Sequence, residues 1–261
     1  MRILLINPNT SADMTQRMVA TARPMLAPDV ELLALTATQG LPYIASRAEA
    51  VVAGAITLEM IAAHQDGMDA VVIAAFGDPG LIAARELFDL PIVAMAEAAM
   101  LTACMLGPRF SIVTFSPALT PWYEDAVALS GMQARCASIR VPEVGFRSVS
   151  DVQHELEAEL VEMTRRAVAE DKADAVILAG APLTGLAQRV ADRVPVPLVD
   201  PLSAAVGQAQ VLARLKPRPA TAGRFARPGP KAATGLSPAL GAWIEHGPSE
   251  AHANGARPNG G

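Results

Sequence analysis

The chain has 261 residues, of which 51% are hydrophobic and 18% charged, and its 21 basic and 26 acidic side chains give a net charge of −5. This composition is typical of a globular protein with a sizeable core, and the acidic balance argues against nucleic acid as a partner. With only two cysteines, Cys104 and Cys136, a disulfide framework and a CxxC metal site are excluded.

Strand-like and helix-like segments alternate along the chain. Strands are predicted at 3–6, 30–35, 70–74, 91–94, 111–114, 175–178 and 197–199, and helices at 11–25, 46–65, 80–88, 98–106 and 152–170. This alternation favours βαβ units and a mostly parallel sheet. In such sheets ligands bind at the carboxyl ends of the strands, so functional residues are expected in the loops that follow them.

The two ends of the chain also carry information. The chain opens directly on a strand-like segment, which leaves no room for a signal peptide, and its longest apolar stretch, 90–107, is interrupted by Glu97. We therefore expect a cytoplasmic protein without a membrane span. From residue 216 on, seven prolines and eight glycines fall within 46 residues. This composition predicts a docked arm at 216–244, or one that reaches a neighbouring subunit, and a flexible tail at 245–261.

An internal repeat indicates two similar halves. The segment DAVVIAAFGDPGL, from Asp69, aligns without a gap with DAVILAGAPLTGL, from Asp174, and the next predicted strand begins with proline in both copies. Chance likeness between two βαβ units is the alternative to duplication. We predict an α/β protein of two pseudo-symmetric parallel-sheet halves, 1–100 with 200–215 and 101–199. In this register Ala75 is equivalent to Gly180, so both face a shared site.

Several motifs together resemble the hydantoin and allantoin racemase branch of the aspartate/glutamate racemase superfamily. They are INPNTS at 6–11, GLPYIASRAEA at 40–50, FGDPGL at 76–81, AEAAM at 96–100, FSIVTF at 110–115, AGAPLTGL at 179–186 and ATGLSPAL at 233–240. The resemblance implies two α/β halves with the site between them, a cofactor-independent racemase and a homo-oligomer. The family's two catalytic cysteines fall on Ala75 and Gly180, which cannot ionise. A two-thiol proton transfer is therefore impossible in this chain.

The candidate substrate-binding residues share a place at or after the ends of predicted strands. They are Asn7, Asn9, Tyr43, Phe76, Gly77, Thr114, Ser116, Gly180, Ala181 and Pro182. An asparagine amide can donate to a carbonyl or carboxylate oxygen, although Asn9 and Thr10 could instead satisfy only the start of the next helix. Arg47 either neutralises an anionic substrate or faces solvent.

The sequence does not assign the catalytic groups, and Asp78 and Glu97 are only weak candidates. Asp78 precedes a proline at a predicted helix start, where a carboxylate usually serves as a cap. Glu97 is either a buried functional carboxylate or a hydrogen-bonded structural one. The four histidines show no metal spacing and no dinucleotide or phosphate-loop motif occurs, so neither a metal nor a cofactor is expected.

Three functions follow from this pattern. The first is a cofactor-independent racemase or isomerase that acts, without the cysteine pair, on a small amino-acid derivative, cyclic ureide or carboxylate. The second is a lyase or hydrolase on the same scaffold, because fold does not fix chemistry. The third is a binding protein that keeps the pocket without turnover. The expected partner is a small molecule in each case.

Overall fold

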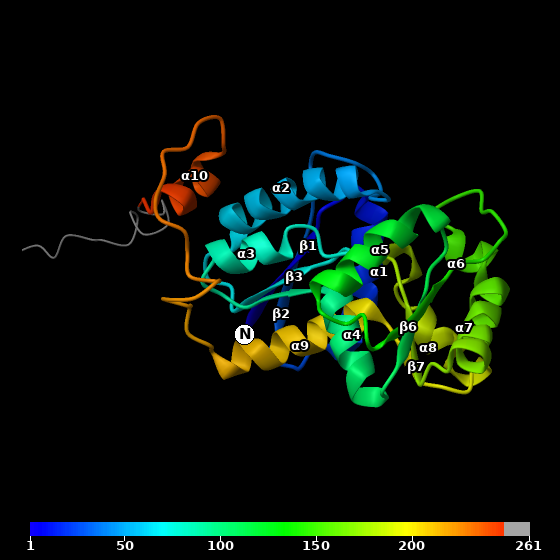
Figure 1. Ribbon diagram of the computed structural model, residues 1–261. Coiled ribbons are helices and arrows are strands. Elements are labelled where there is room, and N and C mark those ends of the chain that lie inside the picture. The colour runs from blue at the N-terminus through cyan, green and yellow to red at the C-terminus, as the bar shows by residue number, and fades with distance from the viewer. Residues whose placement is uncertain (248–261) are drawn as a thin grey trace, which may run out of the picture.

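The computed structural model describes residues 1–247 and contains two parallel four-stranded sheets (Figure 1). In hydrogen-bonded order, the first sheet consists of β2 (Glu31–Thr36), β1 (Arg2–Asn7), β3 (Ala70–Ile73) and β4 (Ile92–Ala94). The second consists, in the same way, of β6 (Cys136–Arg140), β5 (Phe110–Val113), β7 (Ala175–Leu178) and β8 (Leu198–Val199). The two orders are equivalent, and the repeated sequence segments are β3 with β7 and β4 with β8. The prediction of two pseudo-symmetric α/β halves is confirmed.

Helices cover both faces of the first sheet. One face carries α1 (Ala12–Ala22) and α9 (Pro201–Leu215), and the other carries α2 (Arg47–His64) and α3 (Leu81–Leu87). Successive strand residues point to opposite faces, so Leu5 of β1 joins the core under α1 and α9, whereas Ile6 joins the core under α2 and α3. Burial on both faces explains why these strands consist of continuous aliphatic runs rather than an alternating pattern.

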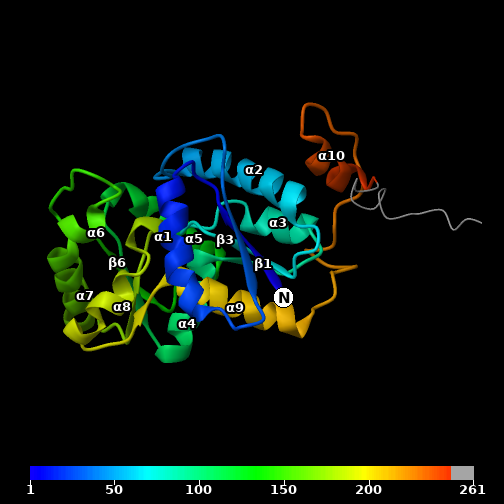
Figure 2. The same ribbon diagram turned by 180° about the vertical axis from the view of Figure 1, so that it is seen from behind.

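Two helices join the halves by crossing between them. Helix α4 (Met95–Leu106) follows β4 of the first sheet, yet its Ala99, Met100 and Ala103 pack into the core of the second sheet. Helix α9 follows β8 of the second sheet and packs on β3 and β4 of the first. The two helices also contact each other, and both views place them between the halves (Figures 1 and 2). The predicted boundary at residue 100 therefore falls inside one continuous helix.

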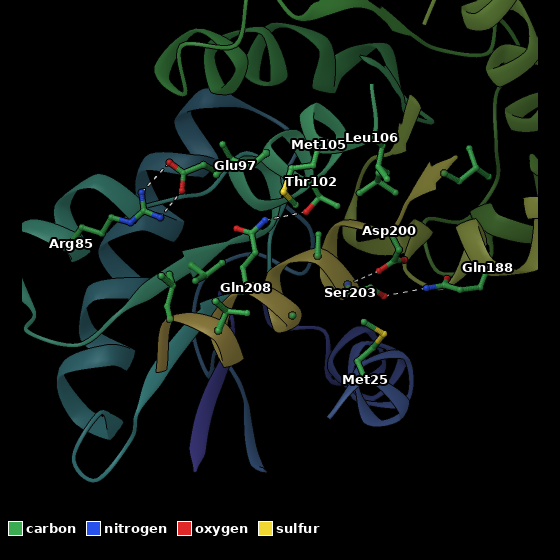
Figure 3. A pocket seen from close by; sticks show the side chains of 18 residues that line it. Met25, Arg85, Glu97, Thr102, Met105, Leu106, Gln188, Asp200, Ser203 and Gln208 are labelled. Carbon is green, nitrogen blue, oxygen red and sulfur yellow. Dashed lines mark hydrogen bonds and ion pairs between the residues drawn. The ribbon is translucent and has the colours of Figure 1, made fainter. Parts of the chain in front are cut away.

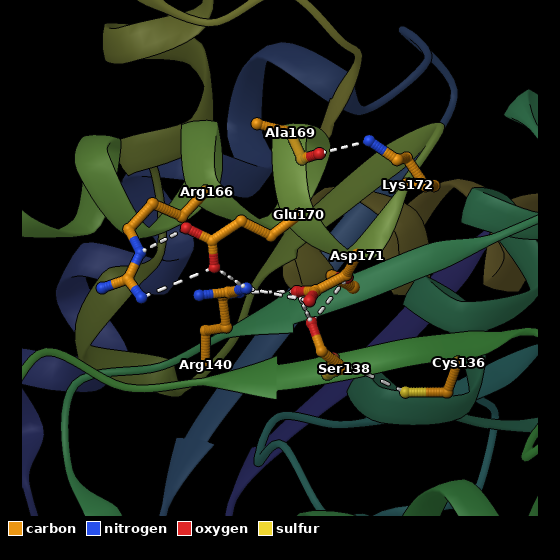
Figure 4. Close-up of polar contacts among 9 residues, drawn as sticks. Cys136, Ser138, Arg140, Arg166, Ala169, Glu170, Asp171 and Lys172 are labelled. Atoms are coloured by element: carbon orange, nitrogen blue, oxygen red, sulfur yellow. Dashed lines mark hydrogen bonds and ion pairs between the residues drawn. The ribbon is translucent and has the colours of Figure 1, made fainter.

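The second half contains α5 (Thr120–Leu129), α6 (Val152–Glu155), α7 (Glu157–Asp171) and α8 (Leu186–Val190). The helix predicted over 152–170 is wrong in one respect, because Leu156 leaves the helical region (φ −117°, ψ 15°) and separates α6 from α7. Strand β6, which the sequence indicates only as a strand edge at 138–141, is tied to the end of α7 by hydrogen bonds to Asp171. Ser138 donates to its carboxylate at 2.6 Å and Arg140 donates at 2.8 Å (Figure 4).

The C-terminal arm lies against the first half, at the end farthest from the second (Figure 2). Its helix α10 (Pro238–Glu245) contacts α2 and buries Leu240. Trp243 packs edge-on against Phe88 with 5.1 Å between ring centroids, and the Arg227 guanidinium lies 4.3 Å from the Trp243 ring centroid. Of the flexible tail predicted at 245–261, residues 248–261 lie outside the described residues.

Candidate functional site

The two repeated loops meet at a small cavity, which we call the central cavity. Ala75, after β3, and Gly180, after β7, both line it, as the repeat register requires. The lining consists of Asn9, Met14, Tyr43, Ile44, Ala75, Phe76, Trp122, Tyr123, Gly180, Ala181 and Pro182. Seven of these eleven residues are positions singled out from the sequence. The loops after parallel strands meet at one edge, which explains the convergence.

Asn7 and Asn9 have different roles, because Asn7 holds the local structure and Asn9 lines the cavity. Asn7 is fully buried, and its amide nitrogen lies 2.9 Å from Asn9 Oδ1 and 3.0 Å from Thr15 Oγ1. Asn9 Oδ1 also accepts the Ser11 backbone N–H at 2.9 Å. Among residues 1–247, the Asn9 amide nitrogen has only Met14 Sδ as a partner, at 3.4 Å. A thioether is a weak acceptor, so the Asn9 N–H₂ group remains available to a ligand carbonyl. Asn7 thus orients Asn9 and does not itself line the cavity.

Aromatic side chains form one wall of the cavity. The Phe76 and Tyr123 rings pack at a tilt of 59° with 4.7 Å between centroids, and the Trp122 ring centroid lies 5.8 Å from that of Tyr123. A Cβ atom at Gly77 (φ +104°) would lie 2.4 Å from the Trp122 indole, so the indole packs directly on the glycine backbone. The sequence reasoning missed Trp122 and Tyr123 because both belong to α5 and not to a repeated loop. The available signal was that each is one of only two residues of its type in the chain.

Both tyrosine hydroxyl groups of the chain are buried here. The Tyr43 hydroxyl has no hydrogen-bond partner among residues 1–247. Burial raises the pKa of Tyr43 far above its usual range, and nearby Tyr123 and Glu49 raise it further. Burial likewise raises the pKa of Tyr123 well above 10, while a hydrogen bond with Thr114 lowers it less. Both phenols therefore stay protonated at neutral pH and act as hydrogen-bond donors rather than bases.

Tyr123 occupies space that a side chain at position 180 would need. A Cβ atom built at Gly180 would lie 3.5 Å from the Tyr123 hydroxyl and 2.8 Å from Phe115 Cε1. The Gly180 backbone (φ +118°, ψ 135°) lies in a region that only glycine adopts without strain. The loop after β7 is thus built around a glycine, with a phenol beside it.

The two carboxylates proposed as weak catalytic candidates are both held by hydrogen bonds to other parts of the chain. Asp78 accepts the backbone N–H groups of Ala96 at 2.7 Å and Glu97 at 2.8 Å, which makes it a cap for α4 and not for the helix that follows it. Glu97 pairs with Arg85, whose Nη1 lies 2.9 Å from Glu97 Oε1. Neither carboxylate lines the cavity.

The titration of Asp78 should give the fold a measurable pH dependence. Burial raises the pKa of its carboxyl to about 7, and the two backbone N–H groups lower it less. The folded chain then holds this proton more tightly than the unfolded chain does. Stability from Asp78 is therefore fully present below about pH 4 and is lost as pH rises through about 7, by at most about 1.4 kcal/mol per pH unit.

Asp78→Asn is accordingly expected to flatten the decline in unfolding free energy between about pH 4 and 7, as measured by urea denaturation. Asp200→Asn is the matched control, because Asp200 caps α9, the helix that follows β8, by accepting Ser203 N–H at 2.8 Å. It should leave the slope due to Asp78 in place. An unchanged slope in Asp78→Asn would contradict the raised pKa.

The remaining candidates support the loops or lie outside the cavity. Thr114 donates to the Ala179 carbonyl at 3.0 Å and so fixes the end of β7 beside Gly180. Ser116 begins a short 3₁₀ turn and does not line the cavity. Arg47 is exposed and forms an ion pair with Asp125, so it offers no charge to the cavity.

Neither cysteine belongs to the central cavity. Cys104 lies 3.8 Å from the Met132 sulfur, and Cys136 belongs to β6. Burial raises the pKa of the Cys136 thiol to about 11, so it holds its proton at neutral pH. Residues 1–247 contain no group of three potential metal-binding side chains, and within the same range no helix is both long and apolar enough to cross a membrane.

The central cavity is small in this conformation. Its volume is about 20 Å³, which is room for about one water molecule. Tyr43 and Ile44 cover it from the segment between β2 and α2, which is fastened by a hydrogen bond from Thr10 N–H to the Leu41 carbonyl (2.9 Å). A ligand larger than this volume requires some of the lining residues to move.

Both the sequence and the fold of this chain are similar to those of known proteins. Residues 3–209 fit the family model "Asp/Glu/Hydantoin racemase". A hydantoin racemase of Paenarthrobacter aurescens is 33% identical over 230 residues, which cover 87% of this chain and 98% of that protein. The structure of an allantoin racemase from Klebsiella pneumoniae superposes with a TM-score of 0.85 at 36% identity, covering 92% of this chain and 98% of the other. Allantoin racemase from Pseudomonas fluorescens gives 0.84 at 32% identity, with coverages of 90% and 100%.

Proposed function

This chain belongs to the Asp/Glu/hydantoin racemase family, and from that premise we propose that its central cavity binds a small neutral ring compound of the cyclic ureide class and exchanges its α-proton. The observation that carries the proposal is the lining itself. Its polar side chains are Asn9, Tyr43 and Tyr123, and none of the lining residues is a lysine, arginine, histidine, aspartate or glutamate. A buried ligand charge would have no charged partner there, whereas ring carbonyls could accept from the amide and the phenols.

The proposed chemistry is an isomerisation without a cofactor. The Cα–H bond of the ligand breaks, its proton passes to a water molecule, and the electron pair spreads onto the adjacent carbonyl. Tyr123, beside Gly180, returns a proton to carbon, because an enolate is a stronger base than a phenolate. The protonated water later returns a proton to the phenolate that Tyr123 becomes, which closes the cycle. No lining side chain supplies a strong base on the opposite, Ala75, face, so we expect slow exchange.

The same lining favours a second candidate, a lyase. A reaction that forms the carbanion by releasing carbon dioxide from a carboxylate needs no base, and one phenol suffices to protonate the carbanion. That route requires an anionic substrate in an uncharged cavity. For this reason the isomerase is the first candidate, and a binding protein without turnover is the outcome if neither reaction occurs.

The test combines thermal-shift binding with proton NMR in D₂O. Hydantoins and allantoin should raise the melting temperature, whereas amino acids and dicarboxylates should not, and a bound hydantoin should slowly lose its α-proton signal. Tyr123→Phe should keep binding and lower the exchange rate by roughly 10²-fold or more. Binding of anions alone, or exchange unchanged in Tyr123→Phe, would contradict the proposal, and a new product would indicate the lyase.

The proposal extends to the setting of the protein. We place it in the cytoplasm as a homo-oligomer, with the halves divided near residues 100 and 200. The absence of a membrane-crossing helix from residues 1–247 is compatible with this setting. Subcellular fractionation and sedimentation of the full chain test the two statements separately.

A further inference from the structure

The two loops that meet at the central cavity are each held by a helix of the opposite half. In the loop after β3, the Trp122 indole of α5 packs directly on the Gly77 backbone. Gly77 is equivalent to Pro182 in the repeat register, and the Pro182 carbonyl accepts from Arg17 Nη1 of α1 at 3.0 Å. Helices α1 and α5 follow the equivalent strands β1 and β5, and both lie at the junction of the halves (Figures 1 and 2). The two halves therefore fix each other's cavity loops at equivalent positions.

Gln153 of α6 holds the loop after β7 from its own half. Its side chain is buried, and its Nε2 donates to the Pro182 carbonyl at 2.7 Å and to the Thr184 carbonyl at 2.8 Å. Both amide hydrogens are thus used on this loop, while its Oε1 accepts from Arg189 Nη1 at 3.0 Å. A buried carbonyl that loses its donor is costly, so these bonds fix the orientation of the loop.

The Pro182 carbonyl is the point at which both halves hold this loop. A carbonyl oxygen has two lone pairs, and here Gln153 and Arg17 occupy one each. Arg17 Nη2 also donates to the Ser150 carbonyl at 2.8 Å, in the segment that leads into α6.

Arg17 also lies on the face of α1 that adjoins the cavity. It follows Met14, which lines the cavity, by three residues, and residues at that spacing are neighbours on a helix surface. The position of this face of α1 and the position of the loop after β7 are therefore set together.

We propose that Arg17 and Gln153 are positioning residues, which set the distance between the two cavity loops by fixing the Pro182 carbonyl. Neither side chain lines the cavity, so both act through the backbone of residues 180–182, beside which the Tyr123 hydroxyl lies. This inference rests on the proposed function, in which Tyr123 returns a proton to the ligand carbon at this loop. Because such a transfer depends steeply on geometry, a small displacement of the loop lowers its rate while binding persists.

Proton NMR in D₂O at saturating hydantoin, beside thermal-shift binding, tests the effect on the reaction. Arg17→Met and Gln153→Met should each lower the α-proton exchange rate roughly 10-fold, while hydantoin still raises the melting temperature. The combined change should lower the rate by more than the two single effects multiplied, because only then does the Pro182 carbonyl lose both donors. Arg17→Lys should give an intermediate rate, since one ammonium group reaches one of the two carbonyls that the guanidinium joins.

Two variants of the same kind elsewhere in the chain are the matched controls. Arg165→Met removes an arginine that donates to the Arg193 carbonyl at 2.9 Å, and Gln210→Met removes a buried glutamine that donates to the Met25 carbonyl at 3.0 Å. Neither side chain lines the cavity, so both controls should keep the exchange rate of bound hydantoin, even where they lower the melting temperature. Equal losses in the controls, or no loss in either loop variant, would overturn the inference.

Amide hydrogen exchange, followed by mass spectrometry, tests the anchoring of the loop without any reaction. Arg17→Met and Gln153→Met should speed amide exchange in the peptide 180–186, where Leu183 N–H donates to the Gly180 carbonyl at 2.8 Å, and the two controls should not. Unchanged protection of this peptide in both variants would overturn the inference. If the unmodified chain exchanges no ligand α-proton, the proposed function is wrong, and the amide exchange alone decides whether the two side chains hold the loop.

Discussion

Ala75→Cys is expected to raise the rate of α-proton exchange on a hydantoin by about 10²–10⁴-fold over the unmodified chain. The central cavity contains phenol donors but no strong base, and Ala75 lines it from the loop after β3. A thiol at this position supplies the missing base, while Tyr123 beside Gly180 supplies the proton donor on the other loop. One added sulfur atom is a small change in volume at a site that already holds a Cβ atom.

Proton NMR in D₂O measures this exchange directly. The rate should rise with pH through the thiol pKa, near 8.5 for an unperturbed cysteine, because the thiolate is the active form. Ala75→Ser is the matched control, since a hydroxyl of similar size does not ionise in this range. If folded, ligand-binding Ala75→Cys exchanges no faster than the serine variant, position 75 does not face the α-proton, and the proposed alignment of the two loops is wrong.

The topology was predictable because the sequence contains the same strand-and-loop segment twice. The Asp69 and Asp174 segments share their apolar run and one glycine position, Gly80 with Gly185, and they form β3 and β7 with equivalent neighbours. Strand β6 could be predicted only as a strand edge at 138–141, because its residues are half-buried and the sequence CASIR lacks a continuous apolar run. The break in the helix at Leu156 could not be predicted from the sequence either, because helical periodicity is similar on both sides of it.

The site was predictable in position but not in chemistry. Loops after parallel strands converge whatever their side chains, so Asn9, Phe76 and Gly180 could be assigned together. The direction of a side chain depends on tertiary packing. Asp78 (φ +56°) caps α4 and not the helix that directly follows it, although α4 begins seventeen positions further along the chain. Glu97 likewise does not line the cavity. It pairs with Arg85 in the hollow between α4 and α9 (Figure 3).

Gly180→Cys is expected to lower the free energy of unfolding by about 2–5 kcal/mol and to give no comparable gain in exchange. The loss has two sources in the loop after β7. The backbone at φ +118° disfavours any side chain, and the new Cβ atom would lie 2.8 Å from the fully buried Phe115 ring. A ring packed in a core cannot give way without disturbing its neighbours.

Urea denaturation of four variants, Gly180→Cys, Gly131→Ala, Phe115→Leu and the double change, separates these sources. Gly131→Ala introduces a side chain at φ +68° with nothing within 4 Å, so it reports the backbone cost alone, about 1–2 kcal/mol. Phe115→Leu combined with Gly180→Cys should recover part of the loss relative to the sum of the single changes, because the smaller side chain makes room. If Gly180→Cys proves as stable as the unmodified chain, the loop accepts a side chain after all. A cysteine pair at positions 75 and 180 would then be compatible with this fold. The proposal that Tyr123 serves as the proton donor in place of a thiol at position 180 would lose its support.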